Sequence, residues 1–235
     1  MFPGFTEDTV RFFLDIRFHN ETGFMHAHHD EYVEKVQKPF YALIEDLSPG
    51  MLKIDPDMET RPVKCLSRIN RDTRYTKDKS PYRDHHWIAF RKSGVDKNGR
   101  PFFWFEFGPD RLSWGLGLWG ENKEALDVLR ARIEKTPDVI ADLVFDLDRH
   151  RLVESGTENR RLYMPPSVPD ALQSLYRKKT LYFERLNPRY TWAGQSDLPK
   201  RLMTDFRRMA PMYRLLDECV AEALAVNTPI LFGGR

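Results

Sequence analysis

The chain has 235 residues, of which 41% are hydrophobic and 31% charged, a balance typical of a globular protein and not of a disordered one. No apolar run approaches the roughly 18 residues that a membrane-spanning helix needs, and the N-terminus shows no secretory signal pattern. The two cysteines, Cys65 and Cys219, lie far apart and outside metal-ligand spacing. We therefore expect a cytoplasmic protein with buried thiols and no membrane partner.

The first 60 residues predict helices. Thr6 followed by Glu7 and Asp8 is typical of a helix start, and the apolar residues after it have helical spacing. A second helix is expected over residues 28–47, with a kink at Pro39. Turns are expected at 48–50 and 55–57, where proline, glycine and aspartate gather.

The middle of the chain predicts a sheet. A short alternating strand is expected over 63–69, and hydrophobic strands over 86–92, 102–107 and 111–119, with turns at 96–101 and 108–110. These turns are too short for a parallel crossover, so the last three strands should pair antiparallel in sequence order. Helical spacing returns after Gly120, with a short helix near 172–176 and a long one over 199–225.

These elements predict an α+β fold. We expect an antiparallel sheet, a meander of about four or more strands, packed with N-terminal and C-terminal helices. No repeat or linker interrupts the chain, so residues 1–235 should form a single domain.

The net charge of +2 conceals a strong asymmetry along the sequence. Residues 61–100 carry 12 basic and 4 acidic side chains, whereas residues 1–60 carry 5 basic and 12 acidic ones. A basic block of this size creates a positive potential that attracts anions, unless acidic helices fold over it and neutralise it.

Within this block, an arginine-rich segment at 68–82 carries the candidate site. The candidate ligand-binding residues are Arg68, Arg71, Asp72, Arg74, Lys79 and Tyr82. Three guanidinium groups within seven residues match carboxylate or phosphate oxygens bidentately. Lys79 adds a mobile charge and Tyr82 a hydroxyl donor, while Asp72 would orient one guanidinium. A turn must intervene before the arginines can converge, because Arg71 points away from its neighbours in an extended chain.

The segment resembles the defining motif of a bacterial family, domain of unknown function 2461, roughly Arg-x-x-Arg-Asp-x-Arg-Phe-x-x-Asp/Asn-Lys-x-x-Tyr. Tyr75 stands where the family usually has phenylalanine, and Gly23-Phe24 where it tends to have Trp-Phe. The resemblance also covers Asn20, Phe24, Tyr32, Pro39, Glu121, Arg130 and Ile133. The family has no established activity, so the resemblance implies a fold and the location of a site, but no reaction.

Our leading hypothesis is that the segment binds a small anionic ligand bearing phosphate or carboxylate. A stronger version of the hypothesis adds turnover of this ligand. The alternative is a non-enzymatic module whose basic surface docks nucleic acid or an acidic partner protein. Arg91, Lys92, Lys97 and Arg100 would extend that surface. In a third reading, the arginines only pin acidic helices to the sheet. The sequence leaves open whether the protein is an enzyme, which ligand it binds and how it oligomerises.

Two weaker patterns predict no cofactor and no metal site. Gly115, Gly117 and Gly120 match G-x-G-x-x-G, but within an antiparallel meander that is no dinucleotide fold. These glycines should bend the strand or admit another backbone. The histidine cluster of His26, His28 and His29 beside Asp30 has no defined metal spacing, so a solvated helix start is the better interpretation.

Overall fold

The computed structural model describes residues 1–94, 99–118 and 120–227. Lys97, part of the turn expected over 96–101, and Trp119, the end of the strand expected over 111–119, lie outside the described residues. In chain order the main elements are α1 (Glu7–Phe18), α2 (Thr22–Ala27), α3 (His29–Tyr32), a π-helical turn η1 (Val33–Gln37), α4 (Lys38–Ile54), α5 (Pro62–Cys65), β1 (His86–Arg91), β2 (Pro101–Gly108), β3 (Arg111–Leu118), α6 (Lys123–Lys135), α7 (Pro137–Arg149), β4 (Leu152–Ser155), α8 (Gln173–Arg177), β5 (Tyr182–Arg185) and α9 (Leu198–Asn227). Short 3₁₀ turns cover Asp170–Leu172 and Tyr190–Gly194.

The chain forms two compact units, each made of three separate stretches of sequence. Unit 1 comprises Met1–Ser93, Phe103–Gly115 and Asn187–Arg207. Unit 2 comprises Gly94–Phe102, Leu116–Leu186 and Arg208–Arg235. That residues 1–235 behave as one domain stays a prediction.

The fold is α+β, as predicted. The sheet is antiparallel, with five strands in the order β1-β2-β3-β5-β4, so the expected meander of β1, β2 and β3 is confirmed. The two short strands β4 and β5 were not predicted. They pair antiparallel, with Leu152 opposite Arg185 and Ser155 opposite Tyr182.

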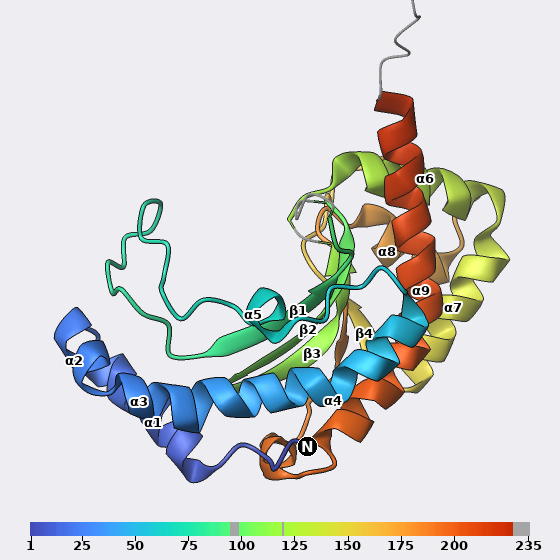
Figure 1. Cartoon of the computed structure of the whole chain (residues 1–235). Coiled ribbons are helices and arrows are strands. Elements are labelled where there is room, and N and C mark those ends of the chain that lie inside the picture. The colour runs from blue at the N-terminus through green and yellow to red at the C-terminus, as the bar shows by residue number, and fades with distance from the viewer. Residues whose placement is uncertain (95–98, 119, 228–235) are drawn as a thin grey trace, which may run out of the picture. The chain divides into compact units, whose positions relative to one another are not determined.

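In unit 1, α1 and α4 lie along one face of the strands, as Figure 1 shows. The strands turn alternate residues toward these helices, which is why Phe105 and Phe107 of β2 are buried while Glu106 between them is not. The ring of Phe5 stacks on Phe107 with centroids 4.5 Å apart, and Phe40 of α4 approaches Phe105 at 6.3 Å. These aromatic contacts hold the N-terminal helices on the sheet.

In unit 2, the end of β3 packs closely against β5. Leu118 donates its backbone N–H to the carbonyl of Leu181 at 3.0 Å. A Cβ atom at Gly117 would lie 2.8 Å from that same carbonyl oxygen and 2.2 Å from a ring carbon of Tyr182. The glycine-rich strand end therefore serves close backbone approach, one of the two roles expected for it.

Two of the expected elements are wrong. Residues 63–69 do not form a strand, because Pro62 starts the short helix α5 and only single bridges, Leu66 to Ile88 and Asn70 to Tyr82, follow it. Residues 48–50 do not form a turn, since α4 continues through Pro49 to Ile54. The buried residues Leu47, Met51 and Ile54 continue the apolar stripe of α4, and this burial outweighs the local turn preference.

The helix expected over 28–47 is divided as well. A π-helical turn over Val33–Gln37 separates α3 from α4, just before Pro39. Pro39 has no N–H, so one backbone hydrogen bond of a regular α-helix cannot form there. The wider π-helical turn accommodates the missing hydrogen bond. None of the helices within residues 1–94, 99–118 and 120–227 is long and apolar enough to cross a membrane.

Candidate functional site

The arginine-rich segment folds as a hairpin, which we call the basic hairpin and define as residues 68–83. Its stem is closed by two backbone hydrogen bonds, from Arg83 N–H to the Ile69 carbonyl at 2.8 Å and from Arg71 N–H to the Pro81 carbonyl at 2.7 Å. In Figure 1 it is the teal loop that extends outward between α5 and β1. This hairpin supplies a turn within the segment, and the convergence of Arg68, Arg71 and Arg74 stays a prediction.

Asn20 fixes the base of the hairpin to the N-terminal helices. Its side-chain amide donates to the carbonyl of Tyr82 at 3.0 Å and its carbonyl accepts from Tyr82 N–H at 2.9 Å. The Tyr82 side chain is itself buried, with 5% of its surface exposed. Tyr82 thus acts as the anchor of the hairpin, and a ligand-binding role for its hydroxyl stays a prediction.

Replacing Asn20 by alanine should loosen the hairpin without unfolding the protein. Two hydrogen bonds are lost, each contributing about 1 kcal/mol, so the free energy of unfolding should fall by roughly 1–3 kcal/mol. Cleavage by trypsin within residues 68–83 should become several times faster, and hydrogen exchange at the Tyr82 amide should accelerate. Asn70→Ala is the matched control, because the Asn70 side chain is exposed. Equal cleavage rates in both variants would contradict an anchoring role for Asn20.

Two of the three arginines are paired with carboxylates of the hairpin itself. Arg71 bonds Asp78, and a second nitrogen of its guanidinium lies 3.4 Å from the Tyr82 carbonyl oxygen. Arg74 donates two side-chain hydrogen bonds to the Asp72 carboxylate, from Nε at 3.0 Å and from Nη2 at 2.7 Å, and its backbone N–H also donates to that carboxylate. The hydrogen bond from the Arg74 side chain is the main reason that the pKa of Asp72 falls to about 2. Asp72 is placed as expected for a residue that orients a guanidinium.

The remaining cations of the hairpin are less constrained. Lys79 donates to the Thr73 carbonyl at 2.7 Å. Arg68 and Lys77 are exposed, and in the described part of the chain their side chains make no ion pair or hydrogen bond. The nitrogen Nε of Arg71 is buried and has no hydrogen-bond partner among the described residues. The hairpin therefore retains positive charge that its own carboxylates do not neutralise.

These ion pairs differ from those of the third reading, in which the arginines would pin acidic helices to the sheet. Asp72 and Asp78, which pair with the hairpin arginines, belong to the hairpin and not to the acidic N-terminal helices. Such exposed pairs contribute little to stability, typically less than about 1 kcal/mol. Elsewhere in the basic block, Arg61 and Lys92 do pair with Glu59 and Asp55 of the acidic first 60 residues.

Residues 8–215 match the family model described as "Conserved hypothetical protein (DUF2461)". The chain belongs to this family. The prediction of domain of unknown function 2461 is thus confirmed, and the basic hairpin lies inside the matched region. No curated protein matches the sequence.

In this DUF2461 protein, Arg83 is a further cation of the site that the sequence analysis did not single out. Its guanidinium lies 4.7 Å from the ring centroid of Trp87 and donates to the Arg68 carbonyl at 2.8 Å. Burial, and the charge of nearby Arg71, lower the pKa of Arg83. Arg83 and His85 precede β1, which begins at His86, and their two-residue spacing from Trp87 is the signal that could have placed the three on one face.

A histidine held between two carboxylates lies next to the hairpin. His85 Nδ1 bonds Asp84 at 2.9 Å, while its Nε2 is 3.5 Å from Glu106 of β2. Arg17 of α1 donates to Asp84 at 2.7 Å. Burial alone would raise the pKa of Asp84, but the hydrogen bonds from His85 and Arg17 lower it. The contact of Nε2 is longer than an ordinary hydrogen bond, and 15% of the His85 side chain is exposed.

The adjacent histidine of the DUF2461 chain, His86, has the opposite environment. It is fully buried, with Nε2 3.0 Å from the Tyr32 hydroxyl and Nδ1 2.9 Å from the Ser67 hydroxyl. Burial is the main cause that lowers its pKa to about 3. His86 is therefore neutral and structural, and it ties the segment before the hairpin to α3.

The N-terminal histidine cluster is not assembled as a metal site. His28 stacks on Phe24 with ring centroids 4.2 Å apart, and its Nδ1 is 2.9 Å from the Phe24 carbonyl oxygen. Among residues 1–94, 99–118 and 120–227, no group of three or more histidine, cysteine, aspartate or glutamate side chains is arranged to hold a metal ion.

Proposed function

We propose that the basic hairpin binds the phosphate or carboxylate group of a small anionic ligand. The observation that carries the proposal is the charge of an exposed loop. Between Arg68 and Arg83 there are six basic and two acidic side chains, and both acids already pair with arginines. A ligand anion can bind Arg68 and Lys77 directly and can compete for Arg71 and Arg74, because exposed ion pairs are weak.

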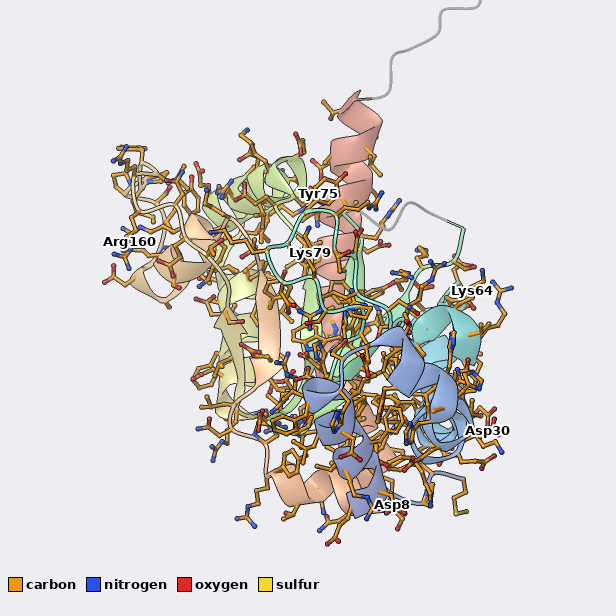
Figure 2. All side chains as sticks on the ribbon, turned by 90° about the vertical axis from the view of Figure 1, so that its left-hand side faces the viewer. Asp8, Asp30, Lys64, Tyr75, Lys79 and Arg160 are labelled. Carbon is orange, nitrogen blue, oxygen red and sulfur yellow. The ribbon has the colours of Figure 1, made fainter. Side chains whose placement is uncertain are left out.

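The acidic N-terminal helices favour a small ligand over a long polyanion. Figure 2 shows Asp8 and Asp30, from α1 and α3, below Tyr75 and Lys79 of the hairpin. A nucleic acid that extended from the hairpin across these helices would meet like charge, which costs binding free energy. A compact ligand held by the hairpin alone avoids that repulsion.

The proposal extends to turnover of the bound ligand. Proton transfer needs a group whose orientation is fixed and whose reactive atom is accessible. His85 lies two residues after the hairpin, is held at Nδ1 by Asp84 and has Nε2 3.5 Å from Glu106. It is the residue that we would assign to such a step.

A second candidate function is docking onto nucleic acid or an acidic partner protein. It is favoured by the outward extension of the hairpin (Figure 1) and by Tyr75, which is 87% exposed. A protruding loop with cations and an aromatic ring suits contact with a large partner as well. The two candidates differ in their response to salt and to the geometry of the cation.

Arg68→Lys tests the leading proposal. The change keeps the charge but removes the planar fork, so the affinity for ribose 5-phosphate should fall roughly tenfold to a hundredfold, as expected for a charged hydrogen bond of about 1.5–3 kcal/mol. Calorimetric titration at two salt concentrations measures this. Arg160→Lys is the matched control, since Arg160 is also exposed but lies in unit 2.

The same titration with a short RNA separates the candidates. Nucleic-acid docking predicts that Arg68→Lys matters little, while the logarithm of the affinity falls steeply and linearly with that of the salt concentration. Binding of RNA alone, with that salt response, would replace the leading proposal by the second. If neither ribose 5-phosphate nor RNA binds the wild type, phosphate binding by the hairpin and docking onto nucleic acid are both wrong.

A further inference from the structure

Tyr75 is an aromatic side chain that the proposed anion site does not use. It lies in the basic hairpin, and 87% of its surface is exposed (labelled in Figure 2). The guanidinium carbon of Arg74 is 5.4 Å from its ring centroid. No other ring contacts Tyr75 in the described part of the chain. One face of the ring is thus available to a partner, and an exposed ring of this size offers apolar area that a ligand could cover.

The hairpin places a cation beside the ring. Asp72 accepts two side-chain hydrogen bonds from the Arg74 guanidinium, which orients this cation beside Tyr75 in the absence of a ligand. Lys77, two residues further along, is exposed and makes no ion pair or hydrogen bond among the described residues. A planar ring and two cations therefore lie within four consecutive residues of an exposed loop. This combination recognises a ligand that is both aromatic and anionic.

We infer that the ligand of the basic hairpin is a nucleotide, whose base stacks on Tyr75 while its phosphate binds the surrounding cations. The inference rests on the proposed function and names its ligand class. A phosphate fits better than a single carboxylate, because the six basic side chains of the hairpin exceed its two acids by four. Both a free nucleotide and the nucleotides of a nucleic acid offer this chemistry.

The test compares three probes on the full chain by calorimetry. Ribose 5-phosphate carries the anion without a base, AMP carries both, and adenosine carries the base alone. Stacking of one base on an aromatic side chain strengthens binding roughly 5- to 150-fold. We therefore expect AMP to bind at least about fivefold more tightly than ribose 5-phosphate, and adenosine to bind more weakly than AMP.

Three variants test whether the tighter binding of AMP comes from the Tyr75 ring. Tyr75→Ala should bring AMP down to the affinity of ribose 5-phosphate and leave the latter unchanged, whereas Tyr75→Phe should keep the gain. Tyr163→Ala is the matched control, because Tyr163 is 75% exposed and belongs to unit 2. It should change neither affinity.

The outcomes distinguish a failure of the nucleotide inference from a failure of the proposed anion binding. If ribose 5-phosphate binds and AMP binds no more tightly, or if Tyr75→Ala leaves the AMP affinity unchanged, the nucleotide is the wrong ligand class while anion binding stands. If no probe binds, both are wrong. If a short adenylate oligonucleotide binds more tightly than AMP, loses affinity steeply with salt and still depends on Tyr75, the inferred chemistry holds and its source is nucleic acid.

Discussion

Replacing His86 by glutamine should flatten the acid limb of the curve of unfolding free energy against pH. In the wild type, burial keeps His86 neutral and lowers its pKa from about 6.5 to about 3. In the unfolded chain the imidazole is exposed and protonates near its ordinary pKa. Between these two values the unfolded state binds a proton that the folded state does not, so the wild type loses stability as the pH falls below 6.5. The loss continues toward pH 3 and then stops.

The expected effect is large. Each pKa unit corresponds to about 1.4 kcal/mol, so the loss between pH 6.5 and pH 4 is on the order of 3 kcal/mol. Urea titrations at several pH values measure the unfolding free energy in wild type and His86→Gln. Protonated carboxylates destabilise both proteins alike, and the difference between the two curves isolates His86. His29→Gln is the control, since the His29 side chain is 64% exposed.

Tyr32→Phe is a second variant that keeps the test decisive if His86→Gln does not fold. It removes the hydroxyl that bonds His86 Nε2 but keeps the buried imidazole. We expect it to lower stability by about 1 kcal/mol or more at every pH and to preserve the slope. An unchanged slope in His86→Gln, or a flattened one in Tyr32→Phe, would show that the pH dependence comes from other groups.

The two adjacent histidines show what the sequence could and could not predict. His86 alternates with Ile88 and Phe90, which face the helices, so the period of the strand could have identified it as buried. The partners of His86 were not predictable, because Tyr32 lies 54 residues away and meets it only through the packing of α3. The contact of His85 with Glu106 depends in the same way on the pairing of β1 with β2, whereas its bond to Asp84 is local.

The ion pairs of the basic hairpin were likewise only partly predictable from the sequence. A turn within residues 68–82 was predicted, because Arg71 would point away from its neighbours in an extended chain. Asp78, however, was not expected to pair with Arg71, since seven residues of loop can bring many different carboxylates to one guanidinium. The short strands β4 and β5 were missed for another reason. Four residues that are mostly half-buried carry too little alternation to be recognised, and it is their pairing that stabilises them.

Arg130→Ala should destabilise unit 2 far more than its charge alone suggests. Arg130 lies on α6 with its side chain only 14% exposed. Its Nε donates to the Tyr176 carbonyl at 2.9 Å and its Nη2 to the Lys178 carbonyl at 2.7 Å. Removing the guanidinium leaves two backbone carbonyls at the C-terminal end of α8, one inside the helix and one just after it, without these donors. We therefore expect a loss of about 3–5 kcal/mol in the unfolding free energy.

Arg132→Ala provides the comparison that decides the cause. Arg132 is on the same helix and pairs with Glu218 and Glu222 of α9, whose side chains are 63% and 56% exposed. Exposed pairs of this kind contribute about 1 kcal/mol or less, so the loss should be several times smaller than for Arg130. Arg130→Lys should remain close to Arg130→Ala, because one ammonium group cannot reach both carbonyls with the same geometry. Equal losses at 130 and 132, or full rescue by lysine, would mean that charge and not the planar fork stabilises this part of the fold.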